Sequence, residues 1–162
     1  MPKVPYLGIG SDHRGFKLKE KLKFFLVSGG YRVNDFGVYC EERADYPLVA
    51  FQLCQHIKEG KRVISPKIDY GILICGSGLG MSIAANKVQG IRAALCLNKE
   101  LAVRARAHNN ANVLVLAADF TSYNKAKEIV KVFLQEKFLG KRHLKRLKQI
   151  KDFEINKLKF NY

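Results

Sequence analysis

Residues 70–88, YGILICGSGLGMSIAANKV, decide the fold because a strand, a glycine-rich turn and a helix follow one another directly. The apolar run 70–75 is typical of a strand buried on both faces of a parallel sheet. Glycines at 76, 78 and 80 allow a tight turn with converging backbone N–H groups, and the next helix adds its positive dipole end. The stretch therefore predicts a loop for an anion or a developing oxyanion, with a purely structural turn as the alternative.

The glycine spacing does not fit two familiar phosphate-binding loops. A dinucleotide-binding fingerprint places its third glycine where this chain has Met81, and a Walker loop requires a Gly-Lys-Ser/Thr sequence that is absent. Cys75 favours a catalytic loop over a purely structural turn, because loop amides and a helix dipole beside it are expected to lower the thiol pKa. We interpret Cys75 as a candidate base or nucleophile, and Cys54 and Cys96 as packing residues.

The remaining sequence alternates apolar runs with amphipathic stretches, which is typical of βαβ units and a parallel sheet. Strands are predicted at 4–10, 31–38, 70–75, 91–97 and 113–118. Helices are predicted at 16–28, 48–58, 81–88, 99–107 and 122–138, with a basic C-terminal helix at about 141–159. The more polar strand 31–38 is expected near an edge, and 60–67 is expected as a surface excursion. We expect one α/β domain over residues 1–162.

The composition argues against several classes of protein. Among 162 residues, 48% are hydrophobic and 27% charged, and no apolar run approaches the roughly 20 residues of a membrane span. The start of the chain lacks the apolar core of a signal peptide. The 4 cysteines form no C-x-x-C pair and the histidines have no metal-ligand spacing. We expect a cytoplasmic protein with reduced thiols, no metal site and no membrane association.

Positive charge is the outlier of this composition. Lys and Arg number 29 against 14 Asp and Glu, a formal net charge of +15. Residues 137–162 carry nine basic and two acidic side chains, so much of the excess lies at the C-terminal end. Such a charge suits nucleic acid, an anionic surface or a phosphorylated substrate, and a solvated helix face is the plain alternative.

Ligands of an open parallel sheet bind outside the carboxyl ends of its strands. This rule selects Asp12 with His13, the loop 75–80, and the turns after Leu97 and Ala118. Asp12 is either a helix cap or a partner for a sugar hydroxyl, and His13 can bind a phosphate oxygen or transfer a proton.

Three further polar residues lie on predicted helices. His108 ends the helix 99–107, where it either stabilises the helix dipole or takes part in chemistry. Arg142 and Arg146 are four positions apart on the last helix, so they share a face and could bind one phosphate together.

Five ordered motifs resemble the ribose-5-phosphate isomerase B family, which includes the ribose/galactose isomerases. They are GSDHRGFKLKEKL at 10–22, ERADYP at 42–47, ILICGSGLGMSIAANKVQGIRAALC at 72–96, RAHNNANVLVL at 106–116 and GKRHLKRL at 140–147. The resemblance covers about residues 4–150. It implies a three-layer α/β/α Rossmann-like sandwich with a five-stranded parallel sheet and a C-terminal helix. It also implies a homodimer or homotetramer with sites between subunits.

The implied activity is the interconversion of ribose 5-phosphate and ribulose 5-phosphate in the non-oxidative pentose phosphate pathway, through a cis-enediol(ate) and without metal or cofactor. The implied catalytic residues are Cys75 as base, Ser77 for the hydroxyl proton, Asp12 at the sugar hydroxyls, and His108 of a neighbouring subunit for ring opening. The implied binding residues are Gly76, Gly78 and Gly80 for the enediolate, Asn109, Asp45 and Tyr46 for the sugar, Asn86 for loop support, and His13, Arg142 and Arg146 for phosphate.

The chain departs from the family pattern after the fifth strand. The family usually has an arginine there, whereas this chain has Ala117-Ala118-Asp119. Asp119 should repel phosphate, so either it faces away or the phosphate depends on His13, Arg142 and Arg146. A longer 60–67 segment and serine in place of threonine at 77 are smaller departures. The alternatives are an isomerase of a six-carbon aldose phosphate (allose or galactose) and, more distantly, a basic nucleic-acid-binding protein.

Overall fold

The computed structural model describes residues 4–58 and 67–157, and its centre is a five-stranded parallel sheet. The strands are β1 (Tyr6–Ser11), β2 (Arg32–Asp35), β3 (Tyr70–Cys75), β4 (Ala93–Leu95) and β5 (Val113–Ala117). Their order across the sheet is β2-β1-β3-β5-β4, and every neighbouring pair is parallel. The predicted α/β class, the parallel sheet and the edge position of the second strand are confirmed.

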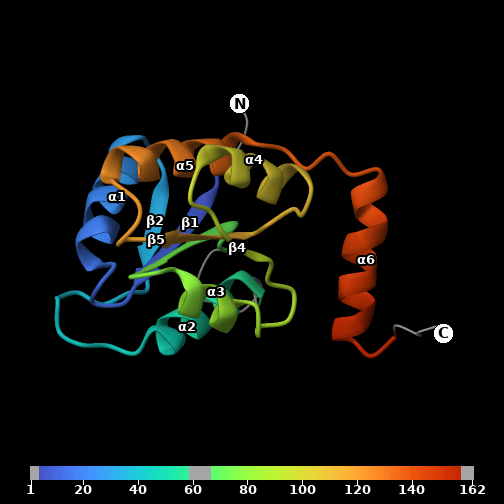
Figure 1. Ribbon diagram of the computed structural model, residues 1–162, viewed down its shortest axis with the longest axis horizontal. Coiled ribbons are helices and arrows are strands. Elements are labelled where there is room, and N and C mark those ends of the chain that lie inside the picture. The colour runs from blue at the N-terminus through green and yellow to red at the C-terminus, as the bar shows by residue number, and fades with distance from the viewer. Residues whose placement is uncertain (1–3, 59–66, 158–162) are drawn as a thin grey trace.

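The helices are α1 (Phe16–Ser28), α2 (Tyr46–Lys58), α3 (Leu79–Ala85), α4 (Lys99–Ala107), α5 (Tyr123–Gln135) and α6 (Arg142–Glu154). Figure 1 shows α1, α4 and α5 on one face of the sheet, α2 and α3 on the other, and α6 standing apart at one side. None of the helices in the described ranges has the length and apolarity of a bilayer span.

The two layers of helices enclose two separate cores because side chains alternate along each strand. In β3, Ile72 and Ile74 pack into the core beneath α1 and α5. Leu73 and Cys75 face the other way, into the core beneath α2 and α3. This alternation directs the sulfur of Cys75 towards the α3 side of the sheet.

The sheet register determines which loops meet. Ser11 of β1 lies beside Ile74 of β3, and Cys75 lies beside Ala117 of β5. The carboxyl ends of these three strands therefore reach the same edge of the sheet. We call this the carboxyl edge, and the opposite side the amino edge.

Most differences from the predicted boundaries have local causes. Helix α3 begins directly after Gly78, whose φ of 77° is left-handed, and ends before Asn86. Helix α5 stops because Glu136 adopts an extended conformation, and α6 ends shortly before Asn156, which has a φ of 55°. Most of the predicted 60–67 excursion, and the end of the predicted C-terminal helix, lie outside the described residues.

Candidate functional site

A pocket of about 260 Å³ opens at the carboxyl edge, and we call it the carboxyl-edge pocket. Its lining residues come from the ends of β1, β3 and β5 and from α2 and α3: Asp12, Arg14, Tyr46, Cys75, Gly76, Ser77, Gly80 and Asp119. Six of these eight were predicted from sequence, whereas Arg14 was not and Asp119 was noted only as a departure. The structure therefore brings together the predicted base, its loop and one predicted carboxylate.

Two glycines of this loop lie where a side chain would meet a neighbouring side chain. A Cβ atom on Gly78 would lie 2.4 Å from Leu95 Cδ1, and one on Gly80 would lie 2.5 Å from Tyr46 Cζ. Tyr46 therefore covers the start of α3, close to the backbone of the loop. The hydroxyl of Ser77 accepts a hydrogen bond from the backbone N–H of Leu79 at 3.3 Å, which holds Ser77 at the pocket.

Cys75 is 4% exposed and its Sγ accepts a hydrogen bond from the backbone N–H of Gly78 at 3.2 Å. Burial raises the pKa of the Cys75 thiol, the backbone N–H groups of Met81 and Gly78 oppose this rise, and the carboxylates of Asp12 and Asp119 add to it. The expectation of a lowered thiol pKa is therefore wrong for the isolated chain. The loop amides are present, but burial and two nearby negative charges outweigh them.

Asp12 shapes the turn before α1 but is not its N-cap, because the N-cap is Gly15, which has no side-chain cap bond. The Oδ1 of Asp12 accepts the N–H of Gly15 at 3.0 Å, and Asp12 also lines the pocket. His13 does not line the pocket, and its Nδ1 accepts the N–H of Ala44 at 3.3 Å. Asp45 is exposed on the same 40–45 segment and also lies outside the pocket lining.

The structure does not bring His108 near Cys75 within one chain. Helix α4 runs antiparallel to the strands, so His108 follows it at the amino edge. Its ring stacks on that of His143 from α6, with centroids 4.5 Å apart and planes 9° apart. Burial lowers the pKa of His143, and His108 with the arginines at 142 and 146 lowers it further. This stacked pair was not predicted, although His143 stands in the GKRHLKRL motif.

Arg142 and Arg146 are also separated from the carboxyl-edge pocket. Both are exposed on α6, four residues apart as predicted. Neither lines the pocket, so within one chain they cannot bind a ligand together with Cys75.

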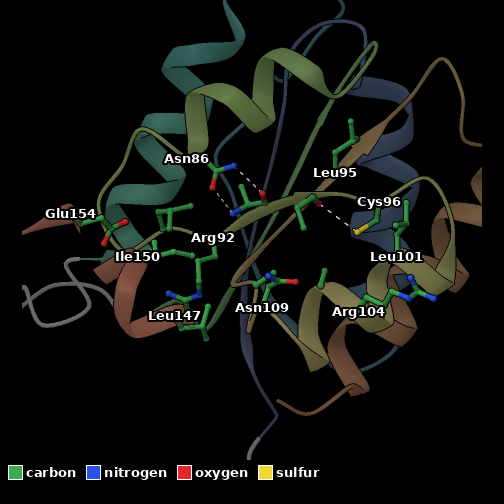
Figure 2. Close-up of a pocket in the computed structure, with 15 residues that line it drawn as sticks. Asn86, Arg92, Leu95, Cys96, Leu101, Arg104, Asn109, Leu147, Ile150 and Glu154 are labelled. Carbon is green, nitrogen blue, oxygen red and sulfur yellow. Dashed lines mark hydrogen bonds between the residues drawn. The ribbon is translucent and has the colours of Figure 1, made fainter. Parts of the chain in front are cut away.

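A second cavity, of about 440 Å³, lies between α6 and the edge strand β4, and we call it the β4–α6 groove. Asn86 and Asn109 line it, together with apolar residues such as Leu95, Leu147 and Ile150 (Figure 2). Asn86 bonds both backbone groups of Ala93 at 2.9 Å, so it supports the link between α3 and β4 rather than the glycine loop itself. The predicted site residues therefore fall into two groups at different places on one chain.

Asp119 does not face away from the pocket. Its Oδ2 accepts a hydrogen bond from Nη2 of Arg14 at 2.7 Å. Sequence reasoning missed this pair because Arg14 and Asp119 are 105 positions apart. The basic residue directly after the predicted Asp12-His13 pair was the available signal.

The fold is that of a sugar-phosphate isomerase class. A family model described as Ribose/Galactose Isomerase matches residues 7–150, and the chain belongs to this family. Ribose-5-phosphate isomerase B of Escherichia coli is 40% identical over 148 residues, covering 91% of this chain and 95% of the relative. The solved ribose-5-phosphate isomerase B of Clostridium thermocellum is 43% identical, with a TM-score of 0.88 over 93% of this chain and 98% of its own.

A further solved structure contains a bound ligand. Ribose-5-phosphate isomerase B from Mycoplasma genitalium, with bound ribulose-5-phosphate, is 38% identical to this chain with a TM-score of 0.85. The match covers 93% of this chain and 96% of that one. The predicted family and its Rossmann-like fold are confirmed.

Proposed function

We propose that this protein is a cytoplasmic isomerase that interconverts ribose 5-phosphate and ribulose 5-phosphate, with Cys75 as the base. The observation that carries the proposal is the position of the Cys75 sulfur, at a pocket and beside the amides of a glycine loop. The ribulose-5-phosphate complex of the Mycoplasma genitalium relative supports the choice of a five-carbon substrate.

In the proposed reaction the thiolate of Cys75 removes the proton from C2 of the opened aldose and returns it to C1. Between these two proton transfers, negative charge develops on the oxygens of a cis-enediol(ate), and the backbone N–H groups of 76–80 stabilise it. Ser77 transfers the hydroxyl proton between the two oxygens, and Asp12 holds the sugar hydroxyls. The raised thiol pKa makes the thiolate a stronger base but keeps its population small until positive charge approaches.

The charge of the carboxyl-edge pocket supports the proposal that it is half of a site. Its described lining contains two carboxylates, Asp12 and Asp119, against one cation, Arg14. A phosphate dianion needs additional positive charge, and the predicted sources, Arg142 and Arg146, lie outside this lining. We therefore propose that a second copy of the chain supplies them together with His108 and Asn109.

The surface formed by β4 and α6 supports the proposal of an interface between copies. The β4–α6 groove is largely apolar, and α6 exposes 57% of Leu144 and 63% of Phe153. Apolar surface of this kind on an edge strand and a helix standing apart is typical of interaction sites. A homodimer or homotetramer assembled through this surface would join the two groups of residues into complete sites.

The test is an isomerisation assay on the purified protein with ribose 5-phosphate in the presence of EDTA. Cys75→Ser is expected to lose at least about one-hundredfold in kcat, because general-base catalysis contributes this much or more, while the substrate still binds. Cys40→Ser is the matched control, since Cys40 is exposed and outside the pocket. Full activity of Cys75→Ser would remove Cys75 as the base.

The same assay decides the carbon number of the substrate. Comparison of kcat/KM for ribose 5-phosphate with the values for allose 6-phosphate and galactose 6-phosphate measures the preference directly. A higher value for either six-carbon substrate would contradict the proposed one.

A further inference from the structure

One ion pair at the carboxyl-edge pocket has no role in the chemistry above. Among the described residues that line this pocket, Arg14 is the only basic one. Its Nη2 donates to Oδ2 of Asp119 at 2.7 Å, with side-chain exposures of 60% for Arg14 and 36% for Asp119. Ion pairs this exposed contribute little to stability, so packing alone does not account for the arrangement.

The pair lies directly across the backbone of Gly76. A Cβ atom at this position would be 2.6 Å from Nε of Arg14 and 2.8 Å from Oδ2 of Asp119. Gly76 is the residue after the proposed base, so the guanidinium and the carboxylate meet over the start of the loop. The absence of a side chain at 76 is what allows them to do so.

The backbone that carries Arg14 is itself fixed. Asp12 accepts the N–H of Gly15 at 3.0 Å, and the Asp12 N–H donates to the carbonyl of Ile74 at 3.2 Å. The turn 12–15 is therefore tied to the end of β3. Arg14 extends from this turn across Gly76 to Asp119, which follows β5.

The chemistry of the pair points to an anion. A guanidinium has five N–H donors in a planar fork, and the contact with Asp119 uses one of them. The other donors remain on a largely exposed group beside the pocket, in the geometry that suits two oxygens of a phosphate. Asp119 alone would repel a phosphate, whereas the paired carboxylate is neutralised and orients the fork.

We propose that Arg14 binds the phosphate group of the sugar phosphate and that Asp119 is a positioning residue for its guanidinium. This inference rests on the proposed function, and it names a group of the same chain that takes part in binding the remote end of the substrate. Binding energy from that end positions the reacting carbons over Cys75.

The first test measures the binding of inorganic phosphate by titration calorimetry. Arg14→Gln is expected to weaken binding by about tenfold to one-hundredfold, the usual effect of losing a charged hydrogen bond. Lys17→Gln is the matched control, because Lys17 is a nearby cation that pairs with Glu41 at 3.0 Å outside the pocket. Equal affinity in wild type and Arg14→Gln, or no phosphate binding by wild type at millimolar concentration, would overturn the proposal.

If Asp119 positions Arg14, the effect of Asp119→Asn on phosphate affinity should have opposite signs with and without Arg14. In the wild-type background, Asp119→Asn weakens phosphate binding although it removes a negative charge. In the Arg14→Gln background the same substitution tightens binding, because the carboxylate there is unpaired. Tighter binding of Asp119→Asn in the wild-type background would overturn the positioning role. Arg14→Lys keeps the charge without the fork, and an intermediate affinity is expected even if Arg14→Gln folds poorly.

The isomerase assay separates this inference from the proposed function. Arg14→Gln is expected to raise KM for ribose 5-phosphate by a factor similar to the loss of phosphate affinity, with a smaller change in kcat. If wild type does not isomerise any sugar phosphate but Arg14→Gln still loses phosphate binding, the proposed function fails and the anion site stands. If wild type isomerises and Arg14→Gln has wild-type KM, the anion site fails and the proposed function stands.

Discussion

A hybrid assembly would test whether each site uses residues of two chains. One chain carries Cys75→Ser and the other carries His108→Asn, and each has a different affinity tag. Tandem purification then isolates assemblies that contain both chains. In a dimer of shared sites, one site receives both substitutions and the other receives Cys75 and His108 intact.

The expected activity follows from the positions of the two residues. Gly71 lies beside Val113 near the amino edge, and Cys75 lies beside Ala117 at the carboxyl edge. The strand between these two pairs spans about 13 Å, at roughly 3.3 Å per residue. His108 lies before β5, beyond the amino end of this span. A side chain does not bridge that distance within one chain, so we expect the hybrid dimer to keep about half of the wild-type activity through its single intact site.

The assay compares the initial rates of ribulose 5-phosphate formation by wild type, both homomeric variants and the hybrid. Each homomeric variant is expected below about 1% of wild type, because each lacks one acid–base group at every site. The hybrid is then at least about fiftyfold more active than either parent.

A reciprocal control reverses the outcome. When both substitutions are placed on one chain and its partner is wild type, every shared site has one defect and activity should be lost. Half activity in this control, together with an inactive first hybrid, would refute the two-chain site and place His108 and Cys75 in the same subunit.

Substitutions of glycine, buried charge and the pocket cysteine test the other physical arguments. Gly78→Ala and Gly90→Ala both force a left-handed φ on alanine, at 77° and 81°, which costs about 1–2 kcal/mol. Only at Gly78 does a new Cβ also meet a neighbour, the end of the Leu95 side chain, which must then move. Gly78→Ala should therefore unfold at a lower urea concentration than Gly90→Ala, and equal midpoints would contradict this. Lys19→Met removes the fully buried Lys19, which lies 2.6 Å from Asp35. Because Lys23 still pairs with Asp35 at 2.7 Å, urea unfolding should show a loss of about 1–3 kcal/mol rather than the larger cost of an unpaired buried charge, and an unchanged midpoint would contradict this. Burial would raise the pKa of Asp35, but hydrogen bonds from Lys19 and a second lysine hold it below its usual range. The stability that Asp35 contributes is therefore present above the unfolded pKa of about 3.9 and is lost as the pH falls through the lower folded value. If Asp35→Asn lost stability at acid pH as steeply as wild type, this would be contradicted. Burial raises the pKa of Cys75, so its alkylation by iodoacetamide, in a variant without the exposed cysteine, should still accelerate above pH about 8.5, and a plateau near neutral pH would contradict the direction.

Much of the fold follows from local patterns in the sequence. The predicted ranges 16–28, 70–75 and 99–107 coincide with α1, β3 and α4. These segments have strong periodicity or continuous apolar character, and both signals are local. The ends of the other elements depend on single backbone conformations, such as the extended residue 136, which a hydrophobic pattern does not encode.

The candidate site was predictable only in part. The loop after β3 and Asp12 were found because the rule for parallel sheets needs only the strand order along the chain. The thiol pKa was predicted in the wrong direction, since its sign depends on burial and on two carboxylates that only the tertiary structure brings close. Arg14 was missed for the same reason: its partner Asp119 is contributed by a strand two positions away in the sheet.

The pleat of β3 links the packing of the hydrophobic core to the direction in which the Cys75 sulfur points. Ile72 and Ile74 occupy one core while Leu73 and Cys75 occupy the other. If β3 slipped by one residue against β1 and β5, an isoleucine would take the place of the cysteine and the sulfur would turn into the opposite layer. The apolar residues of this strand therefore fix its register, and a single-residue insertion there would abolish activity because the sulfur would point away from the pocket.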